Sequence, residues 1–102
     1  MKKFEKDGMI GVLYSPGFGA GWSTWTNTNA EGMCMDRDLV EAVLKEDFRT
    51  AATIAEERYD AYTGGVDDLV VEWVDKGDQF EISEYDGNER LVMIGQQTYM
   101  IA

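Results

Sequence analysis

The sequence predicts an α+β fold in which two helices lie on one face of a mainly antiparallel sheet. Two apolar stripes with helical spacing occupy the middle of the chain, and strand-like segments stand before and after them. Turn signals between the later segments favour antiparallel pairing, and the predicted order is β-α-α-β-β-β. The 102 residues are predicted to form a single domain, 1–102.

The first predicted strand is Met9–Tyr14, whose almost wholly apolar sequence is typical of a strand covered on both faces. Pro16 ends this strand because proline has no backbone N–H to donate. Residues 17–32 are predicted to form a loop rich in glycine, tryptophan and small polar residues. A loop of this length in a small domain usually serves a function.

Two helices are predicted between residues 38 and 59. Asp38 and Glu41 have the spacing of a capping box at the start of the first helix. Asp47 is predicted to cap the second helix, which ends before a Gly-Gly pair. Their apolar stripes are Leu39, Val40, Val43 and Leu44 in the first helix, and Phe48, Ala51, Ala52, Ala55 and Tyr59 in the second.

Alternating apolar residues predict strands over residues 69–73 and 80–82, joined by a turn at residues 76–78. Asp86-Gly87 is a strong signal for a two-residue hairpin turn. The remaining strands are predicted at residues 91–94 and 98–101.

The charge and the missing residue types exclude several function classes. The chain has 20 acidic and 9 basic residues, a net charge of −11, no histidine and one cysteine. The acidity argues against nucleic-acid or membrane binding, and the missing histidine removes imidazole catalysis and imidazole metal ligands. A lone cysteine fits a reducing cytoplasm. We therefore expect a cytoplasmic protein with no catalytic residues, no cofactor and no metal.

Candidate ligand-binding residues gather after the first strand. Alternate glycines allow the backbone to aim consecutive N–H groups inward, as in anion-binding nests, and aromatic rings stack on planar bases. We predict phosphate binding by the N–H groups of Gly17, Gly19 and Gly21, helped by neighbouring hydroxyls, with a base stacked on Trp22 or Trp25. The predicted set in this loop is Tyr14, Ser15, Gly17, Phe18, Gly19, Gly21, Trp22, Ser23, Thr24 and Trp25.

Other interpretations of this loop stay open. The glycines also suit a tight connection whose aromatic side chains fill the core. The dinucleotide-binding pattern G-x-G-x-x-G is excluded because Trp22 stands where its third glycine belongs, and a P-loop is excluded because no lysine follows the glycines.

A second candidate loop follows the second helix. Asp60, Tyr62 and Thr63 are predicted to close the site by contacting a ribose or a base edge. The alternative is a plain helix stop at the Gly-Gly pair.

Three further groups of residues carry weaker predictions. The carboxylates are expected at caps, turns and solvated faces, with a weak divalent-cation site left open at Glu84, Asp86 and Glu89. Cys34 is expected to be a buried thiol, since the chain has no imidazole to activate it. The arginines considered for an anionic ligand are Arg37, Arg58 and Arg90, each with a surface ion pair as the alternative.

Three runs of sequence resemble small proteins of bacteriophage and prophage genomes. These are YSPGFGAGWSTW at residues 14–25, DAYTGG at residues 60–65 and EYDGNE at residues 84–89, about a quarter of the chain. The resemblance implies a phage context, in which small proteins include anti-defence factors that sequester nucleotide second messengers of bacterial immunity. It implies no catalytic residues.

The leading hypothesis from the sequence is a homo-oligomeric protein that binds a small nucleotide-like ligand without turning it over. The alternative is an acidic protein-binding inhibitor, or nucleic-acid mimic, of a host defence protein, because an excess of carboxylates attracts basic grooves. Two further alternatives are a metal-dependent hydrolase that uses carboxylates and a small assembly protein with an aromatic loop at a subunit contact.

Overall fold

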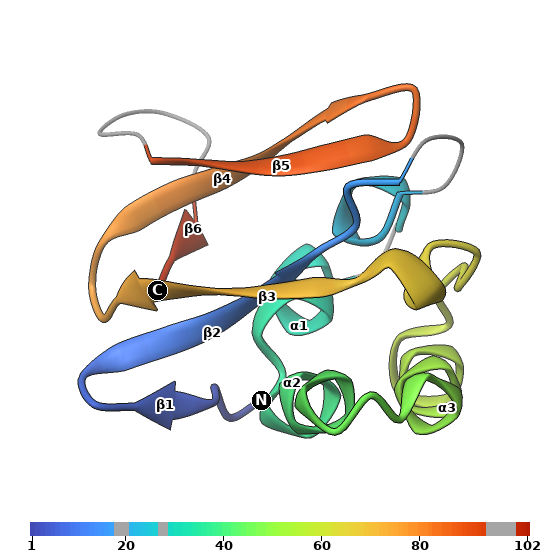
Figure 1. Cartoon of the computed structure of the whole chain (residues 1–102), viewed down its shortest axis with the longest axis horizontal. Helices are drawn as coiled ribbons and strands as arrows, with labels where there is room; N and C mark the ends of the chain where they lie inside the picture. Colours follow the sequence, from blue (N-terminus) through green and yellow to red (C-terminus); the bar gives the residue numbers. More distant parts are fainter. Residues whose placement is uncertain (18–20, 27–28, 94–99) are drawn as a thin grey trace.

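The computed structural model describes residues 1–17, 21–26, 29–93 and 100–102. Over these residues it confirms the α+β class, with three α-helices and two three-stranded antiparallel sheets (Figure 1). The first sheet has the order β1-β2-β3, formed by Glu5–Lys6, Met9–Tyr14 and Val70–Asp75. The second has the order β5-β4-β6, formed by Asn88–Met93, Gln79–Tyr85 and Met100–Ile101. The helices are α1 (Ala30–Met35), α2 (Arg37–Leu44) and α3 (Phe48–Tyr59), with 3-10 turns η1 (Ser23–Trp25) and η2 (Val66–Asp68).

Strand β2 lies in the middle of the fold and is buried on both faces, as predicted from its continuous apolar sequence. Ile10 and Val12 pack on the side of Phe80 from β4. Leu13 packs with Leu39 of α2 on the other side. Figure 1 accordingly shows α2 and α3 on one side of the β2–β3 pair and the β4–β5 hairpin on the other. The helices therefore do cover one face of a sheet, while the second sheet covers its opposite face.

The helical predictions hold for α3 and need correction at the start of α2. Asp47 caps α3 by accepting a hydrogen bond from the backbone N–H of Thr50, at 3.2 Å. The cap of α2 is Asp36, not Asp38, because the Asp36 carboxylate accepts the backbone N–H of Asp38 at 2.8 Å. Helix α1 occupies part of the region predicted as loop, and Asn29 caps it.

Of the two turns predicted after the helices, one forms a hairpin and the other does not. The residues 76–78 do not join a hairpin, because β3 pairs with β2 while β4 pairs with β5 and β6. Asp86 and Gly87 form the predicted hairpin turn, both with positive φ, between the paired residues Tyr85 and Asn88. The last predicted strand is observed at Met100–Ile101, and its first two residues lie outside the described part of the chain.

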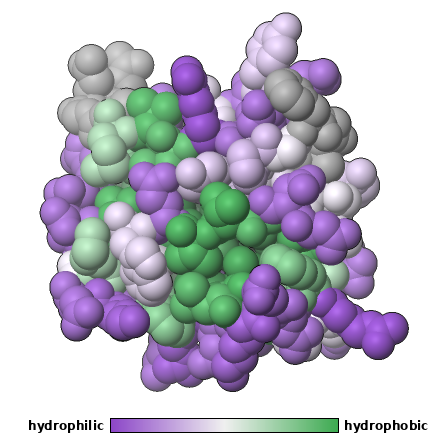
Figure 2. Space-filling view, viewed as in Figure 1, coloured by the Kyte–Doolittle hydropathy of each residue, from purple (hydrophilic) through white to green (hydrophobic). Residues whose placement is uncertain are grey.

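Figure 2 shows the molecule from the same side as Figure 1. An apolar area lies in the middle of this view, where β3 crosses Figure 1, and hydrophilic side chains border it. The exposed apolar side chains of the molecule include Leu44 and Val70. Among the described residues, no helix combines the length and the apolar character needed to cross a membrane.

Candidate functional site

The glycine-tryptophan loop closes around the side chain of Glu89, which is 0% exposed. Glu89 Oε1 accepts the backbone N–H of Ser15 at 2.9 Å. Its Oε2 accepts the backbone N–H groups of Trp22 at 2.8 Å and Thr24 at 3.0 Å, and the Thr24 hydroxyl at 2.5 Å. The backbone N–H of Glu89 in turn donates to the Ser15 carbonyl at 2.8 Å. Four donors therefore converge on one buried carboxylate.

The loop thus surrounds an anion with N–H donors, but the anion is part of the chain, and the backbone donors belong to Ser15, Trp22 and Thr24 and not to the glycines that were predicted to bind phosphate. The donors predicted to bind phosphate include Thr24, whose N–H and hydroxyl both bind Glu89 instead. Gly17 lies beside the Asp68 carboxylate, where a side chain at position 17 would collide with it. A second anion at this point would meet two carboxylates. The predicted Phe18 and Gly19 lie outside the described residues.

The two tryptophans of the loop have different environments. Trp22 is fully buried, and its indole N–H donates to the Met33 carbonyl at 2.6 Å. It therefore belongs to the core and cannot stack on a base from solvent, which corrects that part of the prediction. Trp25 is 40% exposed.

Trp25 stacks on Tyr62 of the second candidate loop, with ring centroids 5.9 Å apart and an interplanar angle of 30°. The two predicted loops therefore meet. The Thr63 hydroxyl donates to Glu56 at 3.2 Å, and Asp60 is the left-handed C-cap of α3, with φ 49°. Tyr14 points elsewhere, since its hydroxyl donates to Glu72 at 2.9 Å.

Ser23 of η1 and Cys34 of α1 are both buried. Burial raises the pKa of the Cys34 thiol to about 12, and the nearby Glu89 and Glu31 carboxylates add to the effect of burial while a hydrogen bond with Ser23 opposes it. The expectation of a buried thiol is confirmed, and at neutral pH this thiol is not a nucleophile.

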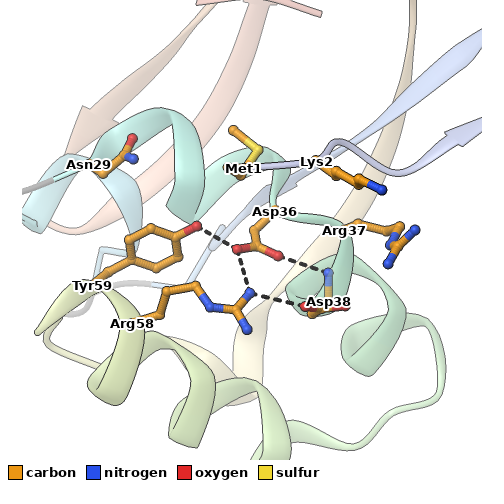
Figure 3. Close-up of a pocket in the computed structure, with 8 residues that line it drawn as sticks. All are labelled: Met1, Lys2, Asn29, Asp36, Arg37, Asp38, Arg58 and Tyr59. Carbon is orange, nitrogen blue, oxygen red and sulfur yellow. Dashed lines mark hydrogen bonds and ion pairs between the residues drawn. The ribbon is translucent and has the colours of Figure 1, made fainter.

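A second polar site lies where α1, α2, α3 and the N-terminal segment meet (Figure 3). Asp36 is its centre. One carboxylate oxygen of Asp36 accepts the Tyr59 hydroxyl at 2.5 Å and an Arg58 N–H at 2.8 Å. Arg58 also reaches Asp38 at 3.1 Å, so the ion-pair interpretation of Arg58 is confirmed.

The contacts of Asp36 change the acidity of the groups around it. Burial raises the pKa of the Asp36 carboxyl, but the hydrogen bonds from Tyr59, Arg58 and the Asp38 backbone together hold it below its ordinary value. Burial and the Asp36 carboxylate raise the pKa of Tyr59 to about 12. The pKa of Arg58 is raised by its hydrogen bonds to Asp36 and Asp38. Asp36 therefore stays negatively charged and Arg58 stays positively charged over a wide pH range.

A pocket of about 440 Å³ is lined by this polar cluster, which consists of Asp36, Asp38, Arg58 and Tyr59. Two further cationic residues, Lys2 and Arg37, line it, and the backbone N–H of Arg37 donates to the Lys2 carbonyl at 2.7 Å. Neither side chain forms an ion pair with another described residue. The sequence predicts Arg37 and Arg58 separately as candidates for binding an anion, but it does not predict that Lys2, Asp36 and Tyr59 join them. No local pattern links residues so far apart in the chain.

The other predicted arginine, Arg90, lies elsewhere. It lines a smaller pocket of about 270 Å³ on the β4–β5 hairpin, together with Glu84 and Tyr85. The open divalent-cation site is not formed, since the Glu89 oxygens are occupied by N–H and O–H donors. Over the described residues, no three acidic or cysteine side chains converge to hold a metal ion.

Gly32 of α1 allows the Tyr59 ring to lie against the helix. A Cβ at position 32 would stand 2.5 Å from two ring carbons of Tyr59. We expect Gly32→Ala to lower the free energy of unfolding by about 1–3 kcal/mol, although alanine is the better helix former, because the Tyr59 ring must shift away from the new methyl group and so disturb its hydrogen bond to Asp36. Urea unfolding measures this, with Glu57→Ala at an exposed position of α3 as control. Unchanged or increased stability of Gly32→Ala would contradict this packing.

Comparison of the chain with protein-family models, with curated proteins and with solved structures gives no significant match.

Proposed function

We propose that this protein binds a small nucleotide-like anion, without turnover, in the pocket above Asp36. The observation that carries this proposal is the local charge of the pocket. Its lining includes three cationic side chains, Lys2, Arg37 and Arg58, and two carboxylates, Asp36 and Asp38, which leaves a net charge of +1 (3 − 2). The whole chain carries −11. A pocket of opposite sign in so acidic a protein attracts an anion to this one place.

The three cations support different roles. Arg58 is held in place by Asp36 and Asp38, so it offers its remaining N–H groups in a fixed position. Lys2 and Arg37 have no such ion pair among the described residues and are able to close on a phosphate. The volume of about 440 Å³ lies within the range of small-molecule pockets and suits a mononucleotide-sized ligand.

Binding without turnover is supported by the chemistry of the side chains at hand. The chain has no histidine, and the Cys34 thiol is buried with a pKa of about 12. The Asp36 carboxylate is held by three donors, which makes it a poor general base. In the phage context that the sequence resemblance implies, such a protein sequesters a nucleotide-derived immune signal in the host cytoplasm.

The test is a thermal-shift and calorimetric titration with AMP, ADP-ribose, cyclic dinucleotides and inorganic phosphate. We expect at least one nucleotide to bind, and Arg37→Glu to weaken its binding about tenfold or more, because a charge-assisted contact becomes a repulsion. The matched control is Arg49→Glu, an equal charge change on the exposed side of α3, which should bind within about twofold of the wild type.

Two results would overturn the proposal. One is that none of these compounds binds the wild-type protein. The other is that Arg49→Glu and Arg37→Glu lose affinity equally, which would show a diffuse effect of charge. Mass measurement by light scattering in the same buffers tests the proposed homo-oligomer.

A further inference from the structure

Trp25 and Tyr62 form an aromatic pair at the surface, outside the pocket above Asp36. Their exposed fractions are 40% and 54%, so a substantial part of each ring lies open to solvent. We propose that this pair, together with Glu84, is a docking surface for an arginine side chain of a partner protein.

Glu84 gives the pair its charge. Its Oε2 lies 3.4 Å from the indole nitrogen of Trp25 and accepts the backbone N–H of Gly87 at 2.7 Å. The hairpin turn therefore fixes a carboxylate at the edge of the indole ring. Because a guanidinium stacks on an aromatic face and pairs with a carboxylate through parallel N–H groups, an aromatic ring with a carboxylate at its edge matches both modes of arginine recognition.

The surroundings of the pair are acidic. Residues 60–68 contain three aspartates and no lysine or arginine. Glu56 lies next to them, since it accepts the Thr63 hydroxyl. Arg90 is the arginine of this hairpin, and it lines the smaller pocket together with Glu84. The carboxylates of these segments therefore outnumber the Arg90 cation, and on balance their charge attracts a cationic partner.

The same charges disfavour the other occupants of an exposed aromatic pair. A nucleotide base stacked here would bring its phosphate towards Glu84 and the neighbouring aspartates. A second copy of the chain would bring together two proteins that each carry −11. An arginine-bearing segment gains from both the rings and the carboxylates, and the net charge of the chain steers it to the surface.

The test uses three blocked peptides, Gly-Ser-X-Ser-Gly, in which X is arginine, lysine or the uncharged isostere citrulline. Each is titrated into ¹⁵N-labelled protein, and the indole N–H signal of Trp25 is followed by NMR after assignment with Trp25→Phe. We expect the arginine peptide to shift this signal with at least about fivefold higher affinity than the citrulline peptide, and with higher affinity than the lysine peptide.

Variants separate this surface from general acidity. Trp25→Ala, Tyr62→Ala and Glu84→Gln should each weaken binding of the arginine peptide. The control is Met93→Ala, which removes an apolar side chain that is 52% exposed at the other end of the β4–β5 hairpin, where Met93 pairs with Phe80, and it should bind as the wild type does. Arg37→Glu should also bind the peptide no more weakly than the wild type, so this surface and the anion pocket are tested independently.

The proposal is overturned by any of four results. The first is that the citrulline peptide binds as tightly as the arginine peptide, and the second is that Trp25→Ala and Tyr62→Ala both bind the arginine peptide like the wild type. The third is that AMP shifts the Trp25 signal at lower concentration than the arginine peptide does. The fourth is that the signal shifts with protein concentration alone, which would assign the surface to self-association.

Discussion

Glu89→Ala is expected to lower the free energy of unfolding by about 3–5 kcal/mol, one of the largest effects of any single substitution in this chain. The substitution leaves the backbone N–H groups of Ser15, Trp22 and Thr24 without their acceptor. The hydrogen bonds from Ser15 and Trp22 are buried, and each buried donor left unsatisfied costs about 1–3 kcal/mol. Urea unfolding followed by circular dichroism measures the change.

Two companion variants identify the cause. Glu89→Gln keeps the shape of the side chain but turns an NH₂ group towards N–H donors, so we expect its stability to lie between those of Glu89→Ala and the wild type. Arg90→Ala, at the next position on β5 but exposed, should change stability by no more than about 0.5 kcal/mol. If Glu89→Ala is no less stable than Arg90→Ala, the nest does not hold the loop.

The vacated nest should also accept a free anion. In Glu89→Ala the four donors that faced the carboxylate surround a space of carboxylate size. We expect tens of millimolar formate to raise the melting temperature of this variant more than that of the wild type, because only the variant has free donors. An equal shift in both proteins would mean that the salt acts without binding there.

The sequence predicts converging N–H groups in this loop, but neither the residues that supply them nor the anion that they bind. Alternate glycines are a local signal for converging N–H groups, and the predicted donors are those of Gly17, Gly19 and Gly21. The observed backbone donors are those of Ser15, Trp22 and Thr24. The anion comes from Glu89, 67 positions beyond Trp22, and no local pattern distinguishes it from the other acidic residues of the hairpin. Only the packing of the β4–β5 hairpin against the loop brings them together.

The same limit explains why the sequence did not distinguish the buried Trp22 from the exposed Trp25, and why the turn at residues 76–78 was misread. Trp22 and Trp25 stand in nearly the same local sequence, and whether each is buried depends on contacts with distant segments. The turn at residues 76–78 has a composition that suits a hairpin, yet it joins strands of different sheets. In contrast, α3 and the Asp86-Gly87 hairpin follow from period and backbone preference alone, and both are observed.

Asp36→Ala is the second substitution with a large expected effect, about 3 kcal/mol of lost unfolding free energy. It removes the N-cap of α2, worth about 1 kcal/mol, and the acceptor of the buried Tyr59 hydroxyl, worth about 1–3 kcal/mol. The pair with Arg58 adds little, because that side chain is half exposed and its charge is screened by solvent. Asp38→Ala, which removes the other carboxylate bound to Arg58, is the matched control and should cost less than about 1 kcal/mol.

The pH dependence of stability distinguishes this cluster from simple packing. Because the native pKa of Asp36 lies below the unfolded value of about 3.9, its contribution is complete above that pH and is lost as the pH falls through the native pKa. Tyr59 acts in the opposite direction. Its pKa is raised to about 12, so its contribution is complete below the unfolded value of about 10 and is lost as the pH rises from there to about 12.

Unfolding titrations at acid and alkaline pH should therefore show two separable losses. Tyr59→Phe should reduce the alkaline loss, leaving the part due to Tyr14 and Cys34, whose pKa values are also raised. It should keep an acid loss, since Asp36 retains Arg58 and the Asp38 backbone as donors. Asp36→Asn should reduce the acid loss, leaving the part due to Asp47, whose pKa is also lowered. It should also reduce the alkaline loss, because the carboxylate that helps to raise the pKa of Tyr59 is gone. Losses as large as those of the wild type in both variants would mean that these other groups alone govern the pH dependence. The decisive result is a smaller alkaline loss in Asp36→Asn, because this follows only if the Tyr59 hydroxyl donates a hydrogen bond to the Asp36 carboxylate in the folded protein.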